Sequence, residues 1–151
     1  MTKSTRLGVS EIEVIYKPAI GRKPIISSSY DAYVEIKEFY NPNTIALQEE
    51  FVCMFLNRCN RVLGVYPLSL GGITGTVADI RIILGIALKI AATGLIVSHN
   101  HPSGNLSPSK ADKDLTGKIK ECCTMMELKL LDHIVISPEG SFYSFADEGM
   151  L

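Results

Sequence analysis

The chain has 151 residues, of which 46% are hydrophobic and 21% are charged, and its formal net charge is −1. This length and composition indicate one globular domain that is large enough to bury a core. The near-zero charge excludes a general electrostatic attraction to nucleic acid or to an anionic membrane, and no local cluster of basic residues stands out.

The sequence predicts a cytoplasmic protein without a membrane partner. Residues 1–14 lack the apolar core of a signal peptide. The most apolar stretch, 77–97, is interrupted by Asp79, Arg81 and Lys89, which argues against a membrane span. The four cysteines contain no CxxC pair, so we expect free thiols in a reducing compartment.

The alternation of apolar and turn-forming residues predicts a mixed α/β order of elements. The expected elements, in chain order, are a short strand at 11–17, a helix at 30–39, a strand hairpin at 47–56 and 61–69, a helix at 77–92, a strand at 94–99, a helix from Ser107 or Ser109 to about 126, and strands at 129–137 and 141–145. The strand at 47–56 is apolar on both faces, so it is expected at the centre of the sheet. The predicted fold class is α/β, with a sheet between helices.

Two details of the predicted helices can be tested against the structure. Thr76 is a plausible N-cap for the helix at 77–92. In the last helix, a stripe of apolar residues at helical spacing is expected to face the core: Leu115, Ile119, Cys122 and Met126.

The stretch 98–104, with the sequence SHNHPSG, places two histidines at the end of an apolar strand. Alternate side chains of a strand point the same way, so His99 and His101 can share one face. Asp112 falls in the first turn of the following helix. Two imidazoles and one carboxylate form a three-ligand site with an open fourth position, which is what catalytic zinc requires.

Each part of this pattern has a structural alternative. His-x-His is common in surface loops, and Ser109-x-x-Asp112 is also the pattern of a capping box at a helix start. Imidazoles at the end of a buried strand need partners, however, because unpaired polar groups are costly to bury. The combination favours a metal site.

The full pattern, His99-x-His101-Pro102 followed by Ser109-x-x-Asp112, resembles the JAMM motif of the JAB/MPN metalloprotease superfamily. The flanking sequences FVCMFL at 51–56, NRV at 60–62, SHNHPSG at 98–104 and LDHIV at 131–135 look like the RadC-like branch. The resemblance covers about residues 45–147 and implies a mixed, curved β-sheet flanked by helices, of cytidine-deaminase-like architecture. It divides the chain into an N-terminal extension at 1–44, with a short strand and a helix packed on the domain, and a RadC-like JAB/MPN domain at 45–151.

The resemblance also implies a site and a reaction. His99, His101 and Asp112 would bind one zinc ion together with a water molecule. A glutamate from an early strand would bond that water; Glu49 and Glu50 are the candidates, and they lie on opposite faces of the strand. Alignment on the Phe-x-x-x-Phe-Leu pattern favours Glu49. Ser109 would either help to hold the developing oxyanion or only cap its helix.

The reaction implied is zinc-dependent hydrolysis of a peptide or an isopeptide. The alternative is a binding module of DNA repair or recombination whose metal site is structural or vestigial, with DNA as its partner. Full-length RadC-like proteins usually carry an N-terminal segment that resembles helix-hairpin-helix modules, and the residues before Glu49 show no such pattern. Nucleobase deamination is excluded, because the His-x-Glu and Pro-Cys-x-x-Cys motifs are missing.

Two further polar residues fall in the predicted strand at 129–137. His133 is expected in the core or beside a metal ligand rather than as a ligand itself. Asp132 is a candidate acid for orienting one of the ligands.

Overall fold

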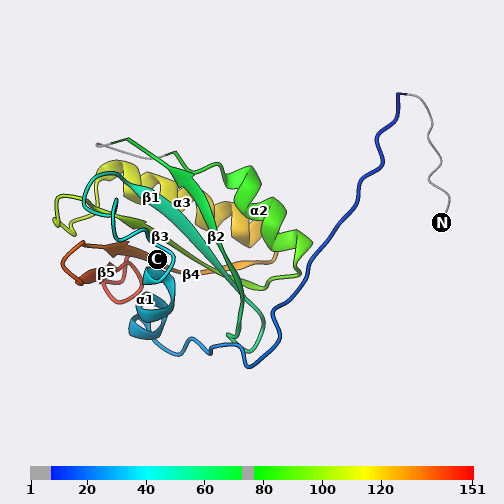
Figure 1. Cartoon of the computed structure of the whole chain (residues 1–151), viewed down its shortest axis with the longest axis horizontal. Helices are drawn as coiled ribbons and strands as arrows, with labels where there is room; N and C mark the ends of the chain where they lie inside the picture. Colours follow the sequence, from blue (N-terminus) through cyan, green and yellow to red (C-terminus); the bar gives the residue numbers. More distant parts are fainter. Residues whose placement is uncertain (1–7, 73–76) are drawn as a thin grey trace.

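The computed structural model describes residues 8–72 and 77–151, and these residues contain a five-stranded sheet in the order β2-β1-β3-β4-β5 (Figure 1). The strands are β1 (Glu50–Leu56), β2 (Val62–Leu70), β3 (Gly94–Asn100), β4 (Lys129–Ile136) and β5 (Phe142–Ser144). β3 and β4 pair in parallel, whereas the other neighbours are antiparallel. The chain crosses over between the two parallel strands through a helix, as that pairing requires.

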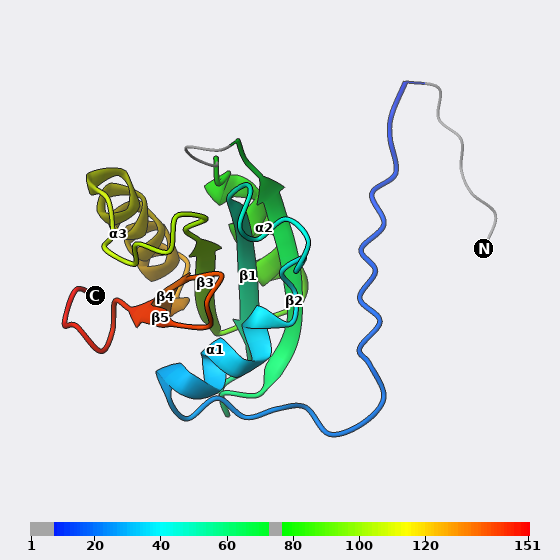
Figure 2. The same ribbon diagram turned by 60° about the vertical axis from the view of Figure 1, so that its left-hand side comes forward.

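Helices cover both faces of the sheet. Helix α1 (Ser29–Lys37) lies on one face, and α2 (Ile80–Lys89) and α3 (Lys110–Met125) lie on the other (Figures 1 and 2). The sheet therefore separates two apolar clusters, one around Ile83, Ile119 and Cys123 and one around Ile36. The predicted α/β class with a sheet between helices is confirmed.

Strand β1 is buried along its whole length, as predicted for the central position. It lies between β2 and β3, and its side chains alternate between the two clusters: Phe51, Cys53 and Phe55 face α2 and α3, whereas Val52, Met54 and Leu56 face α1. The strand starts at Glu50 rather than at 47, because the preceding residues form a turn in which Leu47 and Gln48 donate backbone hydrogen bonds to the carbonyl of Thr44.

The predicted boundaries of the helix at 77–92 are wrong at both ends. Helix α2 starts at Ile80, and its N-cap is Asp79, whose carboxylate accepts a hydrogen bond from the amide of Arg81 at 2.9 Å. Thr76 lies outside the described residues. The helix ends at Lys89, since Ala91 adopts a left-handed conformation with φ of 54°.

Helix α3 begins with Ser109 as its N-cap, not Ser107. Its buried side chains are Thr116, Ile119 and Cys123, whereas Met126 is 43% exposed. The predicted stripe is right at Ile119, whereas at Leu115 and Cys122 the buried residue is the next one along the chain. The reason is that the true stripe continues the face of Asp112 and includes a polar residue, Thr116, which an apolar pattern does not detect.

The strand predicted at 11–17 is absent from the structure. These residues are extended but pair with no strand in the described part of the chain, and the segment runs apart from the domain (Figure 2). Ile12 and Val14 are 87% and 66% exposed. Apolar alternation favours a strand, but a strand forms only where another backbone supplies the hydrogen bonds. The Tyr16 hydroxyl does donate to the carbonyl of Leu63, but this is a side-chain contact.

None of the helices in residues 8–72 and 77–151 has the length and apolarity needed to span a bilayer.

Candidate metal centre

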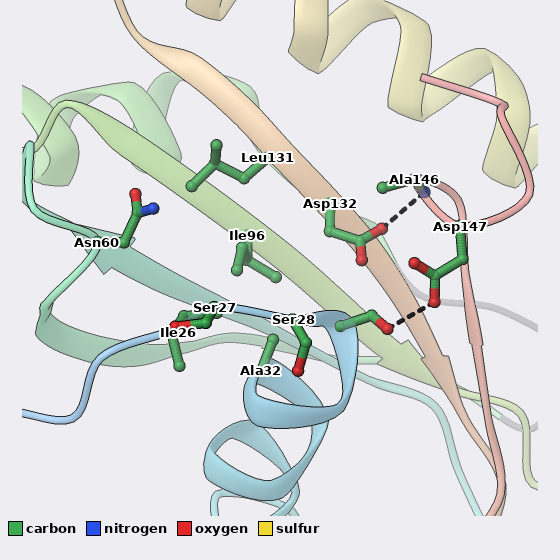
Figure 3. Close-up of a pocket in the computed structure, with 11 residues that line it drawn as sticks. Ile26, Ser27, Ser28, Ala32, Asn60, Ile96, Leu131, Asp132, Ala146 and Asp147 are labelled. Carbon is green, nitrogen blue, oxygen red and sulfur yellow. Dashed lines mark hydrogen bonds between the residues drawn. The ribbon is translucent and has the colours of Figure 1, made fainter.

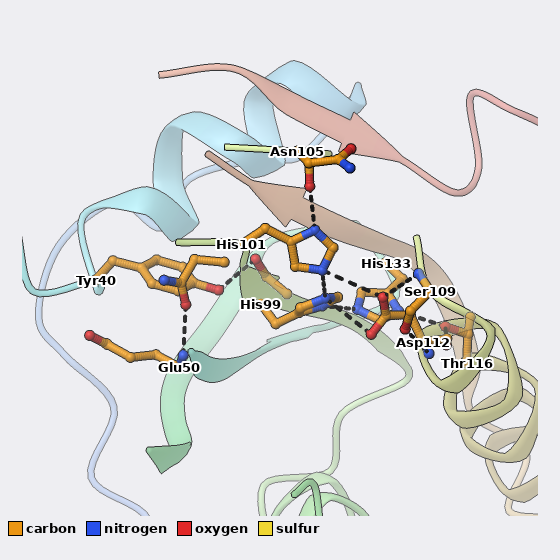
Figure 4. Close-up of polar contacts among 11 residues, drawn as sticks. Tyr40, Glu50, His99, His101, Asn105, Ser109, Asp112, Thr116 and His133 are labelled. Carbon is orange, nitrogen blue, oxygen red and sulfur yellow. Dashed lines mark hydrogen bonds and ion pairs between the residues drawn. The ribbon is translucent and has the colours of Figure 1, made fainter. Parts of the chain in front are cut away.

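Two histidines and one aspartate meet where β3 ends and α3 begins (Figure 4). His99 is buried in β3, His101 follows the strand directly, and Asp112 lies in the first turn of α3. One ligand atom from each lies within 4.8 Å of the others. His99 Nε2 is 3.2 Å from Asp112 Oδ1, His101 Nε2 is 3.5 Å from Asp112 Oδ2, and the two Nε2 atoms are 3.0 Å apart. The structure thus brings together the three residues predicted as metal ligands.

The loop after β3 fixes the orientation of His101. Its Nδ1 is 2.5 Å from the carbonyl oxygen of Asn105, which can only accept a hydrogen bond. Nδ1 therefore carries the proton, and in the neutral ring the Nε2 lone pair faces the cluster. The loop turns at Gly104, whose φ of +81° favours glycine and whose amide bonds the carbonyl of His101 at 2.9 Å.

The capping box predicted at Ser109 and Asp112 is present and serves the same cluster. The Asp112 amide donates to Ser109 Oγ at 3.1 Å, and the Ser109 amide donates to Asp112 Oδ2 at 2.7 Å. The two interpretations of the motif, capping box and metal ligand, are therefore compatible, because the cap fixes the same carboxylate that faces the histidines.

The electrostatics of the cluster favour positive charge at its centre. Burial works against ionisation of Asp112, but the neighbouring imidazoles of His101 and His99 outweigh it and hold the Asp112 pKa well below its usual range. The pKa of His101 is raised, mainly by the hydrogen bond to Asp112 and against the effect of burial. A proton, or a metal cation, would satisfy this arrangement.

His133 lies directly behind His99, as expected for a core or neighbouring histidine. Its Nε2 is 2.8 Å from His99 Nδ1, and its Nδ1 is 2.6 Å from the Thr116 hydroxyl. Its ring stacks on Phe145 with centroids 4.7 Å apart. Complete burial holds the His133 pKa well below its ordinary value, so the ring is neutral at pH 7. The role of Thr116 was missed by the sequence analysis, although its spacing of four residues from Asp112 places it on the same face of a helix.

The hypothesis that Asp132 orients a metal ligand is wrong. Because neighbouring residues of a strand point to opposite faces, Asp132 points away from the face that carries His133. Its carboxylate accepts from the His133 amide at 2.7 Å, the Ser144 hydroxyl at 2.6 Å and the Ala146 amide at 3.0 Å. It borders a cavity of about 280 Å³ beside the start of α1 (Figure 3). Through its bonds to Ser144 and Ala146, Asp132 therefore holds the end of β5 and the residues after it against β4.

The two glutamates before β1 lie in different environments. The Glu50 side chain is buried, accepts a hydrogen bond from Thr44 Oγ1 at 2.9 Å, and points away from the histidines (Figure 4). Glu49 belongs to the opposite face, that of Phe51, which pairs with His99 in the sheet and stacks on its ring at 6.2 Å between centroids. The Glu49 charge also contributes to the raised pKa of His101. Of the two acids, Glu49 is therefore the one on the face of the cluster.

Asn100, between the two histidines, fixes the segment that precedes β1. Its side chain points to the other face of β3 and is fully buried. The amide oxygen accepts from the Glu50 amide at 2.6 Å, and the amide nitrogen donates to the carbonyls of Ile45 at 2.7 Å and Gln48 at 2.9 Å. The sequence analysis gave this residue no role, because its partners are about 50 residues away.

Comparison with known proteins identifies the family of this centre. A family model described as the RadC-like JAB domain matches residues 26–150. The chain belongs to the RadC-like JAB domain family. The predicted RadC-like branch is thereby confirmed, whereas the division into residues 1–44 and 45–151 stays a prediction.

Several curated relatives of this RadC-like JAB domain carry the name UPF0758 protein. That of Flavobacterium johnsoniae is 45% identical over 125 residues, which are 83% of this chain and 53% of the relative. That of Porphyromonas gingivalis is 38% identical over 130 residues, or 86% of this chain and 56% of the relative. That of Aquifex aeolicus is 34% identical over 117 residues, which are 78% of this chain and 50% of the relative. The chain spans about half the length of these relatives, and their names specify neither a metal nor a reaction.

Proposed function

We propose that this RadC-like JAB domain is a zinc-dependent hydrolase that cleaves a peptide or an isopeptide. The observation that carries the proposal is the convergence of His99 Nε2, His101 Nε2 and an Asp112 carboxylate oxygen within 4.8 Å. These atoms supply electron pairs, so they are best satisfied by a shared cation. Two imidazole nitrogens and one carboxylate oxygen fit the ligand set of catalytic zinc, which keeps a fourth position for water or substrate.

When bound, the zinc would lower the pKa of a water molecule to about 7 and polarise the scissile carbonyl. Glu49, on the same face as the histidines, would accept the proton of the attacking water and deliver it to the leaving amine. The Ser109 hydroxyl accepts a hydrogen bond from the Asp112 amide, which leaves its own proton available for a developing oxyanion. Its place at the N-terminus of α3 adds the favourable end of the helix dipole.

We place this activity in the cytoplasm. The support is that all four cysteines, including the exposed Cys59, are free thiols in the structure. Free thiols persist in a reducing compartment.

Metal analysis combined with a cleavage screen tests the proposal. The purified protein is expected to hold about one zinc per chain, and His99→Ala to lose it. Against a panel of peptides and lysine-linked isopeptides, Glu49→Gln is expected to keep the zinc and lose about 10²–10⁴-fold in rate, as for removal of a general base. Glu50→Gln is the matched control and is expected to retain cleavage.

Two results would contradict the proposal. One is a folded wild-type protein that binds no zinc. The other is a Glu49→Gln variant that cleaves as fast as the wild type. Zinc binding without cleavage, together with DNA binding that weakens steeply with salt, would favour the alternative of a DNA-binding module with a structural metal site.

A further inference from the structure

A chain of hydrogen bonds leads from Asp112 to His99, two of the three candidate zinc ligands, behind the metal centre. Asp112 and Thr116 are one helical turn apart in α3, and the Thr116 hydroxyl donates to the Asp112 carbonyl at 2.6 Å. The same hydroxyl lies 2.6 Å from His133 Nδ1, and His133 Nε2 lies 2.8 Å from His99 Nδ1. His99 in turn faces the Asp112 carboxylate at 3.2 Å. His133 and Thr116 are both buried.

The three hydrogen bonds of this chain have only one consistent arrangement of protons. A carbonyl oxygen can only accept, so the single hydroxyl proton of Thr116 points to Asp112. The hydroxyl oxygen must then accept from His133, which places a proton on His133 Nδ1. His133 is fully buried, and no carboxylate in residues 8–72 or 77–151 bonds its ring, so it carries only that proton and its Nε2 is bare.

The unprotonated Nε2 of His133 accepts a hydrogen bond from His99, and this bond determines the tautomer of His99. His99 therefore carries its proton on Nδ1, on the side away from the metal centre. Its Nε2 lone pair faces Asp112 and His101.

We propose that Thr116 and His133 are positioning residues, which fix His99 in the tautomer whose Nε2 lone pair is aimed at the metal and thereby raise metal affinity. The affinity part of this inference rests on the proposed zinc site, whereas the tautomer part holds for the metal-free protein. Partners of this kind fix the ring orientation of metal-binding histidines, and their removal typically costs 10–100-fold in metal affinity.

Thr116→Val tests the proposal, because it removes the hydroxyl and keeps the branched shape. His133 Nδ1 then lacks an acceptor, so its proton is expected to move to Nε2 and to be donated to His99 Nδ1. His99 would then carry its own proton on Nε2, directed at the metal site. Thr116→Ser restores the hydroxyl. Thr124→Val is the matched control, since the Thr124 hydroxyl makes the same bond to the carbonyl four residues earlier but is exposed and contacts no histidine.

The readout is direct because the chain contains three histidines, and all three lie in this cluster. Nitrogen-15 NMR of the metal-free, histidine-labelled protein reports which ring nitrogen carries each proton. Zinc affinity is measured separately by competition with a chromophoric chelator. We expect Nδ1 protonation of His99 and His133 in the wild type, Thr116→Ser and Thr124→Val, and Nε2 protonation of both with a 10–100-fold weaker zinc affinity in Thr116→Val.

The inference is overturned if the wild-type protein itself shows His99 protonated on Nε2, a measurement that needs no variant. It is also overturned if Thr116→Val keeps the wild-type tautomers and binds zinc within twofold of the wild type. Failure of the proposed hydrolase has a different signature. In that case the tautomers and the zinc affinity respond as expected, but no peptide or isopeptide is cleaved.

Discussion

Asn100→Ala is expected to destabilise the domain, because the Asn100 side chain satisfies three backbone groups at once. The variant leaves the Glu50 amide and the carbonyls of Ile45 and Gln48 without their partner. The hydrogen bond that the Glu50 amide donates is buried, whereas the two hydrogen bonds to the carbonyls are partly buried. In the variant, water can therefore hydrogen-bond the two carbonyls in place of Asn100, but it reaches the buried Glu50 amide less readily.

The size of the effect follows from the cost of buried groups without a partner, which is about 1–3 kcal/mol each. Taking about 1 kcal/mol for each of the three groups gives a loss of about 3 kcal/mol in the free energy of unfolding. For a domain of this size, 1 kcal/mol shifts the melting temperature by about 2–4 °C, so we expect a decrease of about 6–12 °C. The segment that carries Glu49 should also be held less firmly, because it keeps its backbone bonds to Gly71 and Gly72 but loses those to Asn100. This would lower cleavage while His99, His101 and Asp112 still bind zinc.

Urea unfolding followed by circular dichroism measures this loss, and metal analysis shows whether the centre is intact. Asn105→Ala is the matched control: its side chain is exposed and accepts one hydrogen bond, from the Ser107 amide at 3.0 Å, so its cost should stay below about 1 kcal/mol. The reasoning is refuted if Asn100→Ala unfolds within about 0.5 kcal/mol of the wild type, which is the range of ordinary surface substitutions.

Three further measurements test other parts of the structure. Chelation of the zinc-loaded protein should lower its stability by about 2.7 kcal/mol when free zinc had been 100 times its dissociation constant; an unchanged melting temperature would contradict the metal site. Burial raises the pKa of Asp132, so its contribution to stability is present below about pH 4 and is lost as the pH rises through the folded-state pKa. In urea unfolding, wild-type stability relative to Asp132→Asn should therefore fall as the pH rises above about 4. In thiol labelling of the native protein, exposed Cys59 should react first, whereas burial raises the pKa of Cys123 to about 11 and should protect it.

The Asp132 and thiol-labelling predictions each have an outcome that would contradict them. A difference between wild type and Asp132→Asn that stays flat or rises with pH would show that Asp132 does not titrate as a buried acid. For the thiols, Cys59→Ser should remove the fast phase of labelling. A fast phase that persists in this variant would place the reactive thiol elsewhere.

The local sequence was sufficient to predict the ligands of the candidate centre and the position of the central strand. Residue alternation alone predicted that His99 in β3 and His101 directly after it share one face, and the capping pattern placed Asp112 in the first turn of α3. Apolar side chains on both faces of β1 indicated its central position, which the structure confirms. These features depend on residues within one or two turns of a helix or strand, so short-range periodicity is enough to detect them.

The same local rules failed where a partner strand or a docked helix decides the outcome. The stretch 11–17 has the alternation of a strand but pairs with no backbone in the described part of the chain. Helix α3 buries Thr116 and Cys123 more deeply than Leu115 and Cys122, and Thr116 thereby reaches His133 on β4. Both results depend on long-range contacts that periodicity does not encode.

By itself, the sequence determined the α/β class, the family resemblance and the three residues with the chemistry of a zinc site. Only the tertiary structure decided the surroundings of that site: that the Glu50 side chain is buried against Thr44, that Asn100 holds the segment before β1, and that Thr116 and His133 lie behind His99. The physical reason is that these contacts follow from the register between strands and from the docking of α3 on the sheet. Both are settled by the packing of segments that lie far apart in the chain.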